Sequence, residues 1–251
     1  MTVTRRQLIT RGLAAAAGAS GLAVAARLAG RYGLVPPDHG SLYGVGGTLT
    51  YGAQRMLTSG QSLAREFPRS AVSAVAPVNG PAPDTDAYLA LIDAEFVPWR
   101  LVVDGLVERP SSFSLAELRR FPSTSQVTLH TCEEGWSFIA EWTGVALSHV
   151  LQAVGTSARA RYVVFFPFDQ WWDSLDMSDA LHPQTLLAYG MNGQELPADH
   201  GAPLRLRVAR QLGYKSIKFL SRVTVVESLD RIGRGVGSSA AESGYAWYAG
   251  I

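Results

Sequence analysis

The sequence contains a single cysteine, Cys132, and this limits what can hold the chain together. One cysteine forms no intramolecular disulfide, and it excludes zinc sites and iron–sulfur clusters that need several thiolates. The 251 residues, 47% of them hydrophobic, are enough to bury one sizeable core. Any chemistry at Cys132 is therefore that of a lone thiol, or a single bond to a preassembled cofactor.

The charge of the chain excludes one large class of partner. The formal net charge is +1, and the basic residues do not form one tract. The sequence therefore lacks the concentrated positive charge of a nucleic-acid-binding protein, and we expect no nucleic-acid partner.

The N-terminus has the pattern of an export signal. Arg5 and Arg6 precede an uncharged run rich in Ala and Gly at residues 12–26, which is shorter than the roughly 20 residues of a membrane-spanning helix. This resembles a twin-arginine signal, which exports folded proteins. We expect residues 1–30 to be such a signal or an uncleaved anchor, with a basic amphipathic helix as the alternative. The protein is then periplasmic, or on the outer face of the cytoplasmic membrane.

The remaining residues divide by composition. Residues 31–85 are rich in Gly, Ser and Pro, with one amphipathic stretch at 48–57, and we expect an extended linker or an arm that wraps the rest. Residues 86–251 are expected to form the globular domain. Its patterns predict strands at 99–107 (turning at Asp104-Gly105), 127–130, 162–166, 204–208 and 217–226, and helices at 114–118, 143–154 and 178–187. Short strands and helices without regular βαβ spacing predict an α+β fold with mixed sheets.

The first group of residues that could carry chemistry surrounds Cys132. It follows a predicted strand and precedes a loop containing Gly135. The acidic neighbours Glu133 and Glu134 would raise the pKa of a thiol and weaken it as a nucleophile, whereas a bound metal would deprotonate it. The local sequence leaves open whether Cys132 is a metal ligand or an inert buried residue.

Two further groups lie in turn-rich segments. His200 and Arg205 lie at residues 192–205, and the segment at residues 213–218 contains Gly213, Lys215, Ser216 and Lys218. A guanidinium beside ammonium groups suits a phosphate, although a solvated charged surface is the alternative. Phosphate-binding P-loops, serine nucleophile elbows and paired-histidine zinc helices are absent from the sequence.

Taken in order, these groups resemble the oxidoreductase molybdopterin-binding domain of sulfite oxidases and of periplasmic methionine sulfoxide reductase catalytic subunits. The similarity covers about residues 99–228. It rests on the motifs Cys132-x-Glu134-Gly135-Trp136-Ser137, Trp142-x-Gly144-Val145, His182-Pro183-Gln184-Thr185-Leu186-Leu187, Asp199-His200-Gly201-Ala202-Pro203-Leu204-Arg205 and Gly213-Tyr214-Lys215-Ser216-Ile217-Lys218.

The resemblance implies a role for each residue. Cys132 would be the thiolate ligand of molybdenum, and Glu134 a carboxylate near the metal. The molybdopterin would be held by His200, Arg205, Gly213, Lys215, Ser216 and Lys218. The implied reaction transfers an oxygen atom to or from a small oxo substrate, such as a sulfur compound.

Two residues point to different branches of the family. His200 matches the sulfite oxidases, whereas Glu134 matches the reductases. We expect no C-terminal immunoglobulin-like dimerisation domain, and hence a monomeric catalytic subunit. Because the chain has no haem motif, we expect a separate membrane haem or cytochrome partner to exchange electrons.

The same residues are compatible with two other classes of function. One is an exported, cofactor-free module that uses the same basic residues to bind an anion. The other is a hydrolase with Cys132 as nucleophile and His130 or His200 as base, against which the acidic neighbours of the thiol argue.

Overall fold

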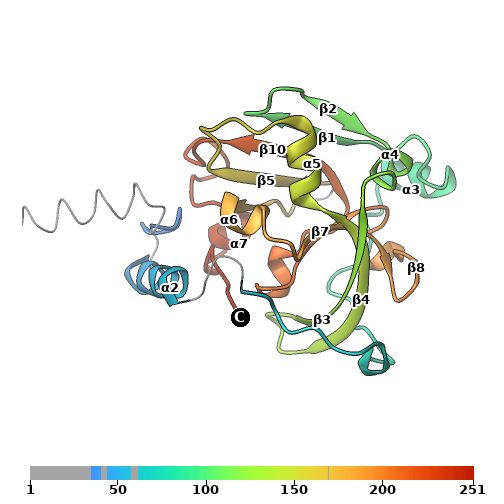
Figure 1. The fold of residues 1–251 in the computed structure, drawn as a ribbon, viewed down its shortest axis with the longest axis horizontal. Coiled ribbons are helices and arrows are strands. Elements are labelled where there is room, and N and C mark those ends of the chain that lie inside the picture. Colours follow the sequence, from blue (N-terminus) through green and yellow to red (C-terminus); the bar gives the residue numbers. More distant parts are fainter. Residues whose placement is uncertain (1–34, 41–43, 58–61, 169) are drawn as a thin grey trace, which may run out of the picture.

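The computed structural model describes residues 35–40, 44–57, 62–168 and 170–251, so the expected signal at residues 1–30 lies outside it (Figure 1). The first of two five-stranded sheets has the order β2-β1-β10-β5-β6. Its strands are β1 (Leu101–Gly105), β2 (Ser111–Phe113), β5 (Tyr162–Pro167), β6 (Asp173–Asp176) and β10 (Leu220–Val226). Only β1 and β10 are parallel, so this sheet is mixed.

The second sheet is antiparallel and has the order β3-β4-β7-β8, with β9 also paired to β7. Its strands are β3 (Ser123–Thr131), β4 (Ser137–Ala146), β7 (Thr185–Met191), β8 (Gln194–Glu195) and β9 (Arg205–Val208). The described helices are α2 (Gly44–Leu57), α3 (Asp86–Asp93), α4 (Leu115–Leu118), α5 (Leu147–Val154), α6 (Met177–Ala180) and α7 (Ser239–Glu242), with 3-10 turns η1 (Arg69–Ala71), η2 (Ala198–His200) and η3 (Gly213–Lys215). The predicted α+β architecture is confirmed.

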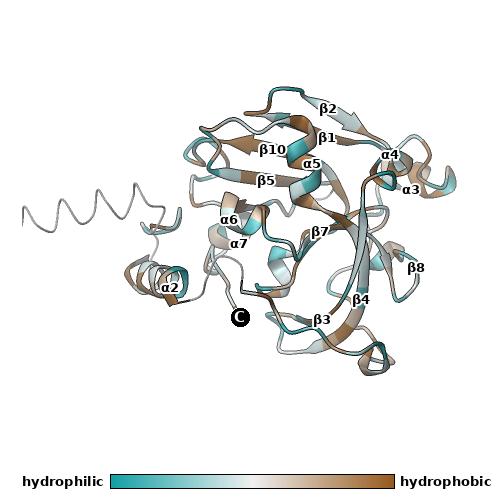
Figure 2. Cartoon of the chain, in the orientation of Figure 1, coloured by the Kyte–Doolittle hydropathy of each residue, from teal (hydrophilic) through white to brown (hydrophobic). Residues whose placement is uncertain are grey.

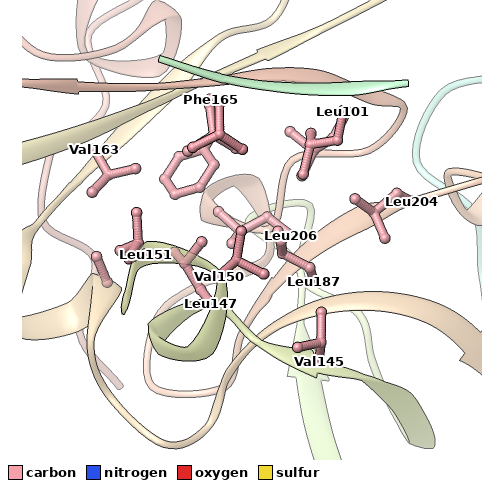
Figure 3. Close-up of a cluster of buried hydrophobic side chains, with 14 of the residues drawn as sticks. Leu101, Val145, Leu147, Val150, Leu151, Val163, Phe165, Leu187, Leu204 and Leu206 are labelled. Carbon is pink, nitrogen blue, oxygen red and sulfur yellow. The ribbon is translucent and has the colours of Figure 1, made fainter. Parts of the chain in front are cut away.

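The main hydrophobic core lies where the two sheets and α5 meet (Figure 3). Phe165 comes from the first sheet, Leu187 and Leu206 come from the second, and Leu147 and Leu151 come from α5; all five are fully buried. Burying each such side chain stabilises the fold by roughly 1.5–3 kcal/mol. The core therefore fixes the position of β9, which carries residues of the candidate site.

Three predicted elements differ from the structure. Residues 143–146 continue β4 instead of starting a helix, because their backbone pairs with β3 and β7. The predicted helix at 178–187 is split between α6 and β7, whose seven residues are all buried and so show no alternation. Asp104 and Gly105 end β1 and make no tight hairpin, since the antiparallel partner is Ser111–Phe113.

The residues before the domain follow the second sheet. The backbone N–H of Phe67 donates to Val127 O (2.9 Å) in β3, and that of Ser73 donates to Ile139 O (2.9 Å) in β4. We call residues 62–85 the arm. Among the described residues, no helix has both the length and the apolar character needed to cross a bilayer.

A buried ion pair connects η3 to β6. Lys215 and Asp173 are each 1% exposed at the side chain, and the ammonium of Lys215 donates to Asp173 Oδ1 and to Ser174 O (2.9 Å). The ammonium also lies 5.2 Å from the ring centroid of Trp247. Removing one partner of such a pair leaves an uncompensated buried charge.

Asp173→Asn should therefore lower the free energy of unfolding by about 3–5 kcal/mol, measured by urea denaturation. The matched control is Glu227→Gln, which breaks the exposed pair with Arg159 and should change stability little. Equal stability of the two variants would show that the buried pair does not hold η3 in place.

Candidate active site

A cavity of about 400 Å³ opens where the arm, the end of β3 and the segments after β8 and β9 meet. It is lined by most of the site residues expected from the sequence: Cys132, Glu134, His200, Arg205, Gly213, Ser216 and Lys218. The arm contributes Pro77, Asn79, Gly80 and Pro81. Residues more than 130 positions apart therefore share one pocket.

Cys132 begins the turn that follows β3. Its N–H donates to Trp136 O (2.9 Å), and Gly135, with a φ of +92°, closes the turn by donating to Cys132 O (3.2 Å). The residue is 4% exposed, yet it lines the cavity. The turn therefore holds the sulfur at the cavity wall.

The hydrogen bonds of the thiol do not activate it as a nucleophile. Asn79 Nδ2 donates to Sγ (3.5 Å), and Sγ donates to Glu133 Oε2 (3.3 Å). Burial raises the pKa of the thiol, and the charge of Glu133 raises it further against the lowering effect of the backbone of Glu134 and of Asn79. In the described chain, neither His130 nor His200 makes a hydrogen bond with the sulfur of Cys132. This argues against the hydrolase alternative, which needs one of these histidines as a base.

Glu134 is exposed at the mouth of the cavity. Its Oε2 accepts a hydrogen bond from Trp136 Nε1 (2.9 Å) and lies 3.9 Å from the sulfur of Cys132. Trp171, 40% exposed, also lines the cavity. The mouth therefore combines carboxylates with aromatic rings.

The inner wall carries buried positive charge. Arg205 and Arg207 extend from the same face of β9, and their guanidinium carbons lie 4.8 Å and 5.6 Å from the ring centroid of Trp142. Arg205 lines the cavity and donates to His200 O and Ser216 O, both at 2.9 Å. Arg207 does not line the cavity. It is fully buried beside Arg205 on β9, and it donates to Leu129 O (2.6 Å) and Val208 O (2.9 Å).

Within the described chain, no ion pair joins either guanidinium to a carboxylate, and both Nε atoms lack a hydrogen-bond partner. Burial lowers the pKa of Arg205 to about 10, and burial with the neighbouring Arg205 lowers that of Arg207 to about 9. Buried charges are normally paired. This wall therefore suits an anionic ligand.

His200 and His130 both lie near the positive charge of Arg205. Burial and the nearby charge of Arg205 lower the pKa of His200 to about 4, so its imidazole is neutral at pH 7. His130 is buried among Trp136, Phe138 and Trp142, and its Nδ1 has no partner. Both rings therefore offer hydrogen bonds to a ligand without adding charge.

The segment after Leu212 approaches His130 closely. A Cβ atom at Gly213 would lie 2.8 Å from His130 Nε2, so only glycine fits at this position. Ser216 O and Oγ are bonded to Arg205 and to the N–H of Val208, which fixes the segment against β9. Lys218 Nζ crosses to the arm and donates to Asn79 O (2.7 Å) and Gly80 O (3.0 Å).

The structure brings seven of the eight expected site residues to the cavity and places the eighth elsewhere. Lys215 does not line the cavity, because its ammonium points away to Asp173 and is buried there. Sequence reasoning did not select Asn79 or Arg207. The alternation Arg205-Leu206-Arg207 around a core leucine was a usable signal for Arg207, whereas Asn79 has no local signal.

The residues fit the group that the family resemblance implies. A thiol at the wall can supply one metal bond, the unpaired Nε of the buried Arg205 suits a phosphate, and Gly213 leaves room at the wall. In the described residues, no cluster of three or more His, Cys, Asp or Glu could hold a metal ion.

Comparisons with known proteins agree with this geometry. A family model described as the oxidoreductase molybdopterin binding domain matches residues 88–231. The putative protein-methionine-sulfoxide reductase subunit YedZ1 of Azospira oryzae is 36% identical over 197 residues, which are 78% of this chain and 71% of that protein. The protein-methionine-sulfoxide reductase catalytic subunit MsrP of Xanthomonas campestris is 36% identical over 161 residues, covering 58% of this chain and 50% of that protein.

The sulfane dehydrogenase SoxCD of Paracoccus pantotrophus has a similar solved structure, with a TM-score of 0.50 and 25% identity over 53% of this chain and 39% of that one. The family model covers more than half of the sequence, and the cofactor class and enzyme class implied by the motifs agree with it. The chain therefore belongs to the oxidoreductase molybdopterin-binding domain family.

Proposed function

We propose that this chain catalyses oxygen-atom transfer to or from a small oxo substrate at a molybdenum cofactor ligated by Cys132. The observation that carries the proposal is a cavity with one thiol on its wall and with the buried Arg205, which has no carboxylate partner in the described chain. When bound, the cofactor supplies the two-electron chemistry of the metal. The protein positions it and tunes its electrostatics.

Each residue at the cavity then has a definable task. Cys132 would be the protein's metal ligand, and binding would release its proton because a metal deprotonates a coordinating thiol. Arg205 would face the anionic part of the cofactor, with the neutral His200 and the backbone around Gly213 and Ser216 as further hydrogen-bonding groups. Lys218 would hold the arm over the site.

The mouth of the cavity favours a neutral oxo substrate over an anion. Glu133 and Glu134 flank the thiol, and Asp199 lies on the same lining, so an approaching sulfite would meet negative charge. Trp136 and Trp171 offer aromatic surface, which contacts sulfur groups favourably. Reduction of an organic sulfoxide, the activity in the names of the Azospira and Xanthomonas relatives, is therefore the preferred direction.

Export and electron supply complete the proposal. The paired arginines at the N-terminus support a twin-arginine route to the periplasm. A separate membrane haem or cytochrome protein would donate electrons to a monomeric catalytic subunit. The alternative, a cofactor-free module that binds an anion, uses the same buried arginines and is distinguished by metal content.

Protein purified from a host that makes the molybdenum cofactor should contain about one molybdenum and one pterin per chain, measured by elemental analysis and pterin fluorescence. Cys132→Ser should abolish turnover and lose the thiolate absorption band while the circular dichroism spectrum stays unchanged. Full activity of this variant would refute the assignment. Folded wild-type protein that lacks both metal and pterin but binds phosphate would favour the binding module.

Glu133→Gln should raise kcat/KM for an anionic oxo substrate such as sulfite roughly fivefold, because it removes one negative charge near the reacting centre. The value for a neutral sulfoxide should change little. Glu108→Gln, at an exposed position away from the cavity lining, is the matched control and should alter neither value. An equal change for both substrates would mean that charge at the mouth does not select between them.

A further inference from the structure

Helix α2 places its polar side against the protein and its apolar side toward solvent. On the inner side, Tyr51 is 4% exposed, and its hydroxyl donates to Asp176 Oδ2 (2.8 Å). Arg55 donates to Asp176 Oδ2 (2.5 Å) and to Asp179 Oδ2 (2.7 Å). Hydrogen bonds and ion pairs therefore fix the orientation of α2.

Aromatic contacts with the C-terminal segment reinforce this orientation. The ring of Tyr51 packs edge-on against Trp247 and Tyr248, with centroids 5.9 Å and 5.1 Å apart. Arg55 also lies 4.8 Å from the centroid of Tyr248. The inner side of α2 is thus fully engaged, and the helix cannot rotate its apolar side inward without breaking these contacts.

The outer face of α2 consists of Val45, Leu49, Met56 and Leu57, which are 78%, 70%, 78% and 85% exposed. The first three fall within about 40° of one another at 100° per residue, so they form one stripe. Arg55, on the inner side, is the only charged residue of the helix. Figures 1 and 2 show α2 at the periphery of the molecule, near the C-terminal end.

This arrangement is the reverse of what a helix on the surface of a water-soluble domain normally shows, with its apolar stripe toward the core. A contiguous stripe of large apolar side chains on the surface marks an interaction site. A second copy of the chain is a poor occupant, since α2 is only about 21 Å long and a stable dimer needs about 800 Å² from each partner.

We infer that the outer face of α2 rests on the surface of a lipid bilayer. The sequence before the helix supports this occupant: residues 12–26 are uncharged and apolar, and Arg5 and Arg6 precede them. Asp38, whose Oδ2 accepts from Trp247 N (2.8 Å), is 12 residues beyond that run, a reach of at most about 40 Å. A run held in a bilayer therefore keeps α2 within reach of the same surface.

Docking through α2 would also orient the cavity relative to the membrane. The C-terminal segment that packs on α2 continues to the cavity, where Leu212 N donates to Ala249 O (2.9 Å) and Tyr214 OH donates to Ala246 O (2.7 Å). Tyr214 lines the cavity. The inference does not depend on the cofactor chemistry proposed above.

The test uses the full chain with its cofactor and vesicles of phosphatidylcholine and phosphatidylglycerol. A polarity-sensitive dye is attached to Leu49→Cys or, as the matched control, to Val97→Cys, whose native side chain is 77% exposed after α3. With vesicles, the dye at position 49 should shift to the blue, and brominated lipid chains should quench it at least about fivefold more than the dye at 97. Wild-type protein, with Cys132 only 4% exposed, controls for labelling elsewhere.

Charge on the outer face should abolish the signal. Val45→Glu with Met56→Glu, added to the Leu49→Cys protein, should return the dye to its emission in water, whereas Val97→Glu added to the same protein should not. Unchanged circular dichroism checks the fold. If the protein floats with vesicles while the dye at 49 stays in water, only the N-terminal run is in contact and the inference is overturned. No binding to vesicles also overturns it, and leaves the face to a protein partner.

Discussion

The candidate site depends on buried arginines that have no carboxylate partner in the described chain. Arg205 and Arg207 extend from one face of β9 over Trp142, and the described chain supplies carbonyl oxygens to them but no carboxylate. Such an arrangement costs free energy in the ligand-free protein, because desolvated charge is poorly compensated by neutral acceptors. An anion bound in the cavity would compensate the buried charge and stabilise the folded state. Cofactor affinity and fold stability would therefore be thermodynamically linked.

The two sheets have different roles around the cavity. The first sheet and α5 build the core that holds one side of β9 through Leu206, while Arg205 on the other side of the strand lines the cavity. Strand β3 ends one residue before Cys132, and the arm contributes part of the cavity lining. The alternation of the β-strand thus directs Leu206 and Val208 into the core and Arg205 to the site.

The sequence predicts much of the fold and of the cavity lining. The features that it does not predict have physical causes. The pattern of short strands and helices predicted the α+β fold, and the resemblance carried by the ordered motifs predicted the family and the seven residues that line the cavity. Lys215 does not line the cavity, and the sequence does not show that Asp173, 42 positions earlier, pairs with it. Asn79 was overlooked because its role comes from a long-range contact. Strand β7 looked helical because a strand buried on both faces has no polar alternation.

The hydrogen bonds from Lys218 to the carbonyl oxygens of Asn79 and Gly80 connect the arm to the segment that follows β9. The arm forms part of the cavity wall but lies outside the residues matched by the family model, and Lys218 fastens it there. A ligand in the cavity would therefore contact both the arm and the domain that the family model matches. Its binding would oppose local opening of the arm, so hydrogen exchange at the backbone amides of the arm would slow when the site is filled.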